Sequence, residues 1–210
     1  MTQGSSESSL AKRHEFSRET HSELKRSEKR EFLSHYVKKN GIGAELGVFW
    51  GHFSEVILRT FRPRRLYLVD LWDMQGDSFG NWGAYTDFGR LQTADCHAYV
   101  KGLEAQHPGV VTVVRDSAEK FLTEYRGEKF DWVYLDTSHR FDETLRQLEL
   151  ISDHLQRDGV ILGDDWIPDP AHPHHDVFRA VHRFIRTADF EIVIAGKGNQ
   201  FVLRRGGSQG

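Results

Sequence analysis

Short apolar runs alternate with longer amphipathic stretches along the chain from residue 41 onward. The apolar runs predict strands at Ile42–Val48, Leu66–Leu71, Val110–Val114, Phe130–Leu135, Gly159–Leu162, Glu191–Ala195 and Gln200–Arg204. The amphipathic stretches predict helices near residues 53–61, 90–106, 117–125, 141–155 and 176–187. Strands that alternate with helices are typical of βα units and a parallel sheet, but the last two runs are too close together for a crossover helix between them. We therefore predict an α/β fold with a doubly wound, seven-stranded, mostly parallel sheet whose last strand is antiparallel.

The residues outside this pattern are expected to form three smaller parts. Residues 1–20 are rich in Ser and Glu and hold too little apolar surface to offset the entropy of ordering them, so a disordered arm is expected. Residues 21–40 predict a charged helix with one narrow apolar stripe. We expect it to pack on the domain as a solvated helix, with an oligomer contact or a lid over a ligand as alternatives. Residues 41–205 would then form the domain, and residues 206–210 a flexible tail.

Composition excludes several classes of protein. A chain of 210 residues is short enough for a single hydrophobic core. The formal net charge of −3 indicates no general attraction to nucleic acid or to anionic membranes. The single Cys96 excludes an internal disulfide, and no apolar run has the length of a secretion signal or a membrane span. We expect a cytoplasmic protein without nucleic-acid or membrane partners, and a homodimer stays an open alternative.

A glycine-containing turn joins the first predicted strand to the helix that follows it. Glu45, Gly47 and Gly51 have the spacing Glu-x-Gly-x-x-x-Gly, and Ser54 lies at the start of the helix. Glycine lets a backbone turn sharply and approach a ligand closely, and a helix N-terminus presents free N–H groups. The pattern therefore suits a nucleotide-like ligand, although the Gly-x-Gly-x-x-Gly of a dinucleotide site does not follow this strand. A turn without any ligand is the alternative interpretation.

Acidic residues end the next two predicted strands. Asp70 closes the second strand, at the edge where open α/β sheets bind ligands. A carboxylate there can accept hydrogen bonds from both hydroxyls of a ribose, and a helix cap or a solvated strand end is the alternative. Asp116 and Ser117 follow the third strand and begin a helix, which capping alone would explain.

Three further carboxylates follow the fourth and fifth predicted strands. Asp136 closes the fourth, and Asp164 and Asp165 close the fifth. If these strands are neighbours in a parallel sheet, their ends lie about 5 Å apart and the three acids converge. Because three such charges repel one another, a cation is expected among them. An all-oxygen cluster favours a hard divalent ion, most simply Mg²⁺, whereas zinc would call for His or Cys.

Two parts of the chain resemble a known family. The Glu45–Gly51 spacing resembles the first motif of class I S-adenosylmethionine-dependent methyltransferases. Residues Asp131–Trp166 are similar to the Asp-Gly-x-His-x-Tyr segment, amphipathic helix and (His/Asp)-Asp strand ending of a group that includes the metal-dependent macrocin-type O-methyltransferases. Thr137 stands where that group has Gly, Phe141 stands where it has Tyr, and only one glycine of the usual pair precedes the fifth strand. Together the resemblance covers about residues 40–205.

The resemblance implies a cofactor, a metal and a set of site residues. S-adenosylmethionine would be the cofactor, bound by Glu45, Gly47, Gly51, Ser54, Asp70, Asp116 and Ser117. The metal, expected to be Mg²⁺, would be held by Asp136, Asp164 and Asp165. His139 falls on the His of the first segment. The implied activity is O-methylation of a small molecule such as a sugar, a catechol-like compound or another natural product.

The chemistry of methyl transfer gives roles to these residues. The acceptor oxygen must be held about 3 Å from the methyl carbon and must lose its proton. A divalent ion can do both, since it orients a hydroxyl and lowers its pKa. Asp136, as a ligand of the ion, and His139, as the base, are the catalytic candidates. His139 as a residue that orients the acids, or as a purely structural one, is also open.

Two other functions remain alternatives. One is a metal-independent methyltransferase that uses His139 as its base. The other is a domain that binds S-adenosylmethionine without catalysis. The histidines of the Pro-rich loop at 168–175 are expected to be exposed, with a substrate or metal contact as the alternative.

The acceptor is expected to contact aromatic residues. The insertion Asp73–Arg90 brings several of them between the second strand and the next helix, and long loops at the ligand edge often serve as lids. The expected contacts are Trp82, Tyr85, Phe88, His139 and Trp166. A surface loop that packs its own aromatic side chains is the alternative.

Overall fold

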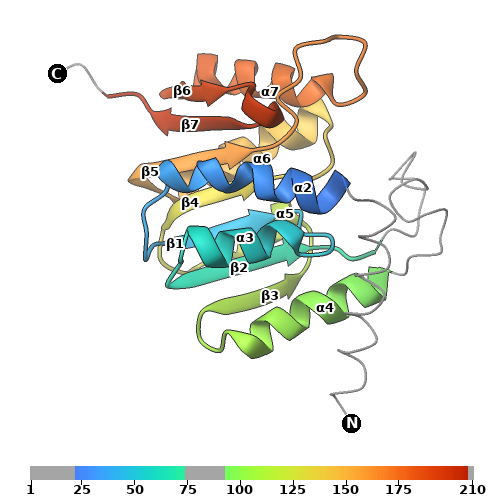
Figure 1. Ribbon diagram of the computed structural model, residues 1–210. Coiled ribbons are helices and arrows are strands. Elements are labelled where there is room, and N and C mark those ends of the chain that lie inside the picture. Colours follow the sequence, from blue (N-terminus) through green and yellow to red (C-terminus); the bar gives the residue numbers. More distant parts are fainter. Residues whose placement is uncertain (1–21, 74–92, 208–210) are drawn as a thin grey trace.

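A seven-stranded sheet forms the centre of the molecule (Figure 1). The computed structural model describes residues 22–73 and 93–207. The strand order is β3-β2-β1-β4-β5-β7-β6. The strands are β1 (Ile42–Leu46), β2 (Arg65–Asp70), β3 (Val111–Arg115), β4 (Phe130–Leu135), β5 (Leu155–Gly163), β6 (Phe190–Ala195) and β7 (Phe201–Arg205). Strands β1 to β5 pair in parallel, and β7 runs antiparallel to both β5 and β6, so the predicted fold class is confirmed.

Helices cover both faces of this sheet. They are α2 (Ser22–Lys29), the 3₁₀ helix η1 (Arg30–His35), α3 (His52–Thr60), α4 (Thr93–Gln106), α5 (Ala118–Glu124), α6 (Phe141–His154), α7 (His175–Thr187) and the short 3₁₀ turn η3 (Lys197–Asn199). In Figure 1, α2, α3 and α4 lie in front of the sheet, and α5 and α6 lie behind it. No helix in the described ranges is long and apolar enough to cross a membrane.

Two hydrophobic cores hold these layers together. Every residue of β1 and β4 is buried, as expected of central parallel strands with helices on both faces. Alternate side chains of β4 point to opposite faces, since Trp132 and Tyr134 pack with η1, α3 and α4, whereas Val133 and Leu135 pack with α5, α6 and α7. Because β1, β2, β4 and β5 are parallel, their carboxyl ends lie at one edge of the sheet.

The N-terminal helix differs from the prediction. A single helix is expected over residues 21–40, but α2 ends at Lys29 and a 3₁₀ helix continues the chain. Three residues per turn place Arg30 and Leu33 on one side, and both are buried against the domain. The 3₁₀ helix thus places the charged side chain of Arg30 in the interior.

Strand β5 begins earlier than expected, at Leu155 instead of Gly159, directly after α6. The exposed residues Arg157 and Asp158 conceal this start in the sequence, although Leu155 already pairs with Phe130. The expected arm, most of the insertion at 73–90 and the last three residues of the tail lie outside the described residues.

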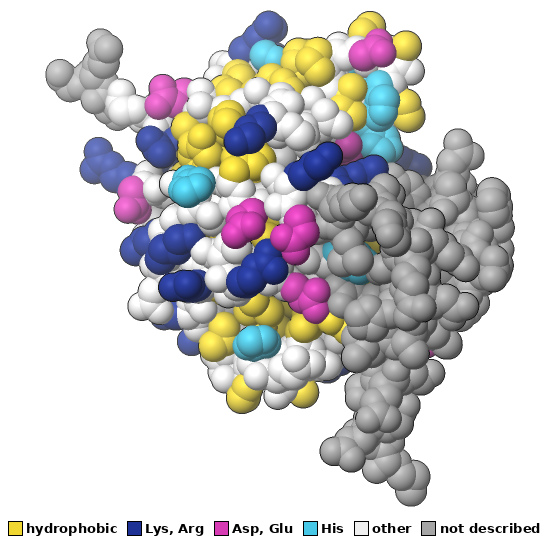
Figure 2. Space-filling view, in the orientation of Figure 1, with side chains coloured by type: hydrophobic (Ala, Val, Ile, Leu, Met, Phe, Trp, Pro, Cys, Tyr) yellow, Lys and Arg dark blue, Asp and Glu magenta, His cyan; other side chains and the backbone are white. Residues whose placement is uncertain are grey.

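The face formed by α2, α3 and α4 carries charges of both signs. Figure 2 shows acidic and basic side chains side by side in the described part of this face. One of these pairs joins Arg59 of α3 to Glu28 of α2 at 2.9 Å, with both side chains more than half exposed. Exposed pairs of this kind contribute about 0–1 kcal/mol to stability.

Candidate functional site

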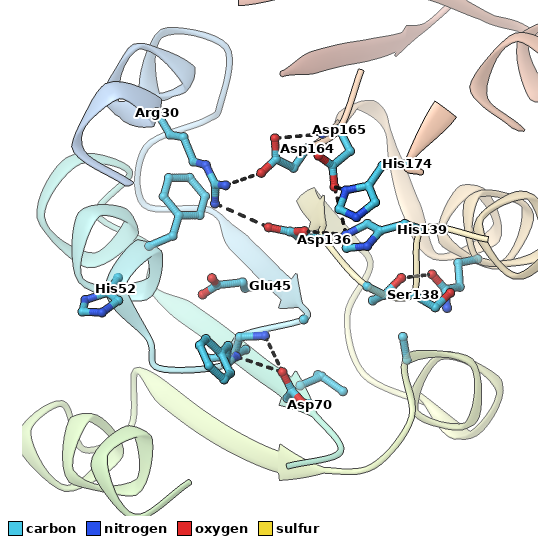
Figure 3. A pocket seen from close by; sticks show the side chains of 18 of the residues that line it. Arg30, Glu45, His52, Asp70, Asp136, Ser138, His139, Asp164, Asp165 and His174 are labelled. Carbon is cyan, nitrogen blue, oxygen red and sulfur yellow. Dashed lines mark hydrogen bonds and ion pairs between the residues drawn. The ribbon is translucent and has the colours of Figure 1, made fainter. Parts of the chain in front are cut away.

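A cavity of about 840 Å³ opens at the carboxyl ends of the central strands. Its volume lies in the range of small-molecule and cofactor sites. It is lined by acids at or next to the carboxyl ends of β1 to β5 and by part of the N-terminal segment (Figure 3). Of the residues predicted for the site, it contains Glu45, Gly47, Asp70, Asp116, Ser117, Asp136, His139, Asp164 and Asp165.

The glycine turn after β1 lies directly against the end of β4. Gly47 has a φ of +87°, and a Cβ atom at this position would lie 1.7 Å from the carbonyl oxygen of Asp136. Its N–H donates to the carbonyl of Val69 at 2.9 Å, and the N–H of Asp136 donates to the carbonyl of Leu46 at 2.8 Å. Only glycine combines this conformation with such a close approach. The two predicted parts of the site are therefore in direct backbone contact.

Asp70 fixes the conformation of this turn. Its Oδ2 accepts the N–H groups of Val48 and Phe49 at 2.8 and 2.9 Å, and its Oδ1 accepts the N–H of Trp72 at 3.0 Å. A carboxylate has about four lone-pair positions, so these three bonds leave about one position unused. A contact between Asp70 and a ribose stays a prediction.

Glu45 is a buried acid at the base of the cavity. Its side chain is 2% exposed and accepts a hydrogen bond from the hydroxyl of Ser54. Burial raises the pKa of Glu45 to about 8, although the bond from Ser54 and the charge of Arg30 act in the opposite direction. In the described part of the chain, Ser54 and Gly51 are not among the residues that line the cavity. Ser54 thus influences the cavity only through its hydrogen bond to Glu45.

Asp116 and Ser117 cap α5. The hydroxyl of Ser117 accepts the N–H of Lys120 at 3.1 Å, and Asp116 binds the Lys120 ammonium at 2.6 Å. The bond to Lys120 lowers the pKa of Asp116. The capping interpretation is confirmed, and since both residues also line the cavity, their contact with a cofactor stays a prediction.

Arg30 places a cation beside two of the three carboxylates, Asp136 and Asp164. Its guanidinium forms an ion pair with Asp164 and lies 3.5 Å from Oδ2 of Asp136 (Figure 3). Its side chain is 9% exposed and lies over the rings of Phe53 and Tyr134, at 5.4 and 5.8 Å from their centroids. Sequence reasoning missed this residue. The available signal was an arginine three residues before Leu33, on the face of the segment that is otherwise apolar.

Asp165 points away from Arg30, toward two histidines. Its Oδ2 lies 2.9 Å from Nε2 of His139 and 2.9 Å from Nδ1 of His174. Nε2 of His139 is also 3.3 Å from Oδ1 of Asp136. The two imidazole rings stack at 4.1 Å between centroids. His174 is therefore a partner of the predicted acids and is only 23% exposed, contrary to the expectation for this loop.

The acids thus do not gather as the sequence predicts. In the described residues, the group whose ligand atoms all lie within 4.8 Å of one another is His139, Asp165 and His174, not the three carboxylates. Asp164 and Asp165 are adjacent, and a φ of +60° at Asp165 lets their side chains take different partners. Asp164 also accepts the Gln200 amide at 2.5 Å.

Burial and neighbouring charges shift the pKa values of His139 and Asp164. Burial alone lowers the pKa of His139, but its contacts with Asp136 and Asp165 outweigh burial and raise the pKa to about 10. Burial and the charge of Asp136 raise the pKa of Asp164 to about 7, against the effect of Arg30. At neutral pH, His139 therefore carries a proton in the ion-free chain and is not ready to accept another.

The aromatic residues predicted to contact an acceptor have mixed outcomes. Trp166 is buried against Phe178 and Phe201, at 4.9 and 6.2 Å between ring centroids, and does not line the cavity within the described residues. Residues of α7 and β7 surround its ring, and a contact between Trp166 and an acceptor stays a prediction. The three predicted aromatic contacts of the insertion, Trp82, Tyr85 and Phe88, lie outside the described residues.

Comparison with known proteins gives a family match and several structural relatives. Residues 44–166 match the family described as a methyltransferase domain. A search of curated proteins finds no match. The 1,6-didemethyltoxoflavin-N1-methyltransferase of Burkholderia thailandensis is similar in structure, with a TM-score of 0.60, 14% identity, and coverage of 95% of this chain and 87% of that one.

Two other solved structures share the fold. The O-methyltransferase TomG of Streptomyces achromogenes has a TM-score of 0.59 at 16% identity, with coverage of 95% of this chain and 90% of that one. An O-methyltransferase of Bacillus cereus has a TM-score of 0.52 at 12% identity, with coverage of 93% and 89%. The family match spans more than half of the chain and contains the glycine turn, Asp70 and all three acids of the β4 and β5 ends. The chain therefore belongs to the methyltransferase-domain family, and the predicted methyltransferase is confirmed.

Proposed function

We propose that the chain transfers a methyl group from S-adenosylmethionine to a hydroxyl oxygen of a small molecule. The observation that carries the proposal is one cavity that holds both Glu45 and the glycine turn at one end and Asp136, His139 and Asp165 at the other. Support for the cofactor comes from the structural relatives, since TomG was solved with S-adenosylmethionine and the Burkholderia enzyme with S-adenosylhomocysteine.

The first end of the cavity suits a cationic nucleoside. Gly47 and Asp70 both line this end, and the remaining lone-pair position of Asp70 can accept one ribose hydroxyl. The buried carboxyl of Glu45 would lose its proton beside the positive charges of the cofactor, because a nearby cation stabilises the ionised form. These residues thus bind and orient the methyl donor.

The second end must orient the acceptor hydroxyl and remove its proton. His139 alone is a poor base at neutral pH, because Asp136 and Asp165 keep it protonated. A divalent ion at this end would lower the pKa of the acceptor hydroxyl. The predicted set of three carboxylates does not fit that ion as the side chains stand, because Arg30 already binds Asp136 and Asp164. We therefore assign no step to Mg²⁺ held by all three acids.

The test is an assay for S-adenosylhomocysteine with the full chain and a panel of hydroxylated small molecules that includes vicinal diols. Turnover and an O-methylated product are expected, with loss of turnover in excess chelator and recovery when a divalent ion is added back. Turnover that is insensitive to chelator would favour the metal-independent alternative with His139 as base. Cofactor binding without product across the panel would instead favour the non-catalytic domain.

Glu45→Gln is expected to stabilise the free chain and weaken cofactor binding. An acid whose folded pKa is raised holds its proton longer in the folded state, so the free energy of unfolding falls as pH rises from about 4.5 toward 8. The slope approaches about 1.4 kcal/mol per pH unit for one group. The neutral amide removes this pH dependence of the free energy of unfolding. Denaturant unfolding at about pH 5, 6, 7 and 8 will measure it.

Glu124→Gln is the matched control, because Glu124 is exposed on α5. It should leave both the pH dependence of stability and the affinity for S-adenosylmethionine unchanged. The role given to Glu45 is contradicted if Glu45→Gln binds the cofactor as tightly as the unmodified chain does.

A further inference from the structure

Two histidines and one aspartate meet at the acceptor end of the cavity. We propose that His139, Asp165 and His174 form a site for a divalent first-row transition ion of the Co²⁺ and Zn²⁺ type rather than for Mg²⁺. The three residues come from separate parts of the chain: the loop between β4 and α6, the end of β5, and the loop before α7. Figure 3 shows both imidazoles directed toward the same carboxylate.

The geometry of these side chains is that of a compact donor set. Oδ2 of Asp165 lies 2.9 Å from Nε2 of His139 and 2.9 Å from Nδ1 of His174. One potential ligand atom from each residue lies within 4.8 Å of the other two. His139 and Asp165 are 16% exposed, so the cluster faces the cavity without being closed off from it. An ion can therefore enter, and part of its coordination sphere would stay open.

Backbone conformation keeps two of the ligands in place. His139 and Asp165 have φ values of +59° and +60°, which are uncommon for residues other than glycine. Strained residues of this kind cluster at ligand and active sites. The third ligand is held from outside the cluster, since the N–H of His174 donates to Nδ1 of His172 at 3.1 Å.

A divalent cation at this end would take the place of the proton that His139 carries in the ion-free chain. Asp136, Asp164 and Asp165 bring three carboxylates to this end, and Arg30 pairs with the first two only. Asp165 has no such guanidinium partner among the contacts described and is bordered by imidazoles instead. An ion at the histidine side would balance Asp165 and the nearby Asp136 without displacing Arg30.

The donor types distinguish this site from an all-oxygen one. Imidazole nitrogen suits zinc, cobalt, nickel and iron, whereas Mg²⁺ prefers oxygen ligands in an octahedral arrangement. Two imidazoles and one carboxylate leave positions open for water or for an acceptor oxygen. With the ion bound, His139 is a ligand and not the base. The inference concerns the cavity of the proposed methyl transfer, but the experiment measures ion binding without cofactor or acceptor, so each can fail independently of the other.

The experiment is a titration of the metal-free full chain with Co²⁺, followed by its visible absorption and by calorimetry. One Co²⁺ per chain is expected, with a spectrum that reports nitrogen ligands. Zn²⁺ should displace it, and Mg²⁺ in large excess should not. Displacement by Mg²⁺ at a concentration comparable to that of Co²⁺ would overturn the proposal.

Variants then locate the ion. His174→Ala should weaken Co²⁺ binding by at least about tenfold, the scale of loss seen even for partners that only support metal ligands. Asp164→Asn should change the Co²⁺ affinity by less than about threefold, because Asp164 is not one of the proposed ligands. His35→Ala tests adventitious binding at an exposed histidine and should change nothing. Should His174→Ala prove unfolded by circular dichroism, His174→Gln takes its place.

The opposite pattern overturns the proposal. If Asp164→Asn abolishes binding and His174→Ala does not, the three carboxylates form the site. If His35→Ala removes the signal, the ion binds only at the surface.

Discussion

Arg30→Met should lower the free energy of unfolding by about 3–5 kcal/mol, the cost of removing one partner from a buried ion pair. Methionine keeps much of the length of the side chain and its packing over Phe53 and Tyr134, but leaves Asp136 and Asp164 without the guanidinium. The measurement is chemical denaturation at neutral pH. We also expect a loss of methyl transfer, because both acids belong to the acceptor end.

Arg59→Met provides the matched control. The pair of Arg59 with Glu28 also joins the domain to the N-terminal segment, but it is exposed. Its removal should cost no more than about 1 kcal/mol. Equal losses in the two variants would show that the buried arrangement of Arg30 contributes nothing beyond an ordinary surface pair, and would contradict our account of the site.

Gly47→Ala should lower the free energy of unfolding by about 2–5 kcal/mol, from two sources. Left-handed backbone costs about 1–2 kcal/mol for a residue with a Cβ atom, and overpacking typically adds about 1–3 kcal/mol. The new methyl group would lie 1.7 Å from the backbone carbonyl of Asp136, which has no rotamer through which to move away. The turn and the end of β4 must therefore separate, with loss of cofactor binding.

The control for this variant is Gly109→Ala. Gly109 has a similar φ of +78°, but a Cβ atom there meets nothing within 4 Å. Its substitution carries the backbone cost alone, about 1–2 kcal/mol. Urea unfolding of both variants separates conformation from contact. A Gly47→Ala protein as stable as Gly109→Ala would show that the turn can yield without displacing Asp136.

The contacts of Asp164 and Asp165 at the end of β5 explain why substitutions around them should affect methyl transfer. Asp164 pairs with Arg30 of the N-terminal segment, while the neighbouring Asp165 contacts one imidazole from the loop between β4 and α6 and one from the loop before α7. Asp136 lies between them and contacts both Arg30 and His139. The acceptor end therefore depends on three separate segments of the chain. A change in any one of them alters the charge balance of the others.

The periodic pattern was sufficient for the fold and for the position of the acids. Apolar runs at strand length, separated by helical periods, gave all seven strands, because burial on one or both faces leaves a local signature in the sequence. The carboxyl ends of neighbouring parallel strands share one edge, so the sequence alone predicts Asp70, Asp136 and Asp164 at that edge. The polar start of β5 at Gln156 to Asp158 lacked that signature and was missed.

Side-chain partners were decided only by the tertiary structure. Arg30 lies 106 residues from Asp136 and 134 from Asp164, and His174 lies nine from Asp165 across an irregular loop. No local pattern in the sequence indicates such pairings, since they depend on backbone angles at single residues and on which segments pack against the cavity. By itself, the sequence determined which charges come to the sheet edge. The packing of η1 and the left-handed turns at His139 and Asp165 decided how those charges are neutralised, because direction is a property of the folded backbone.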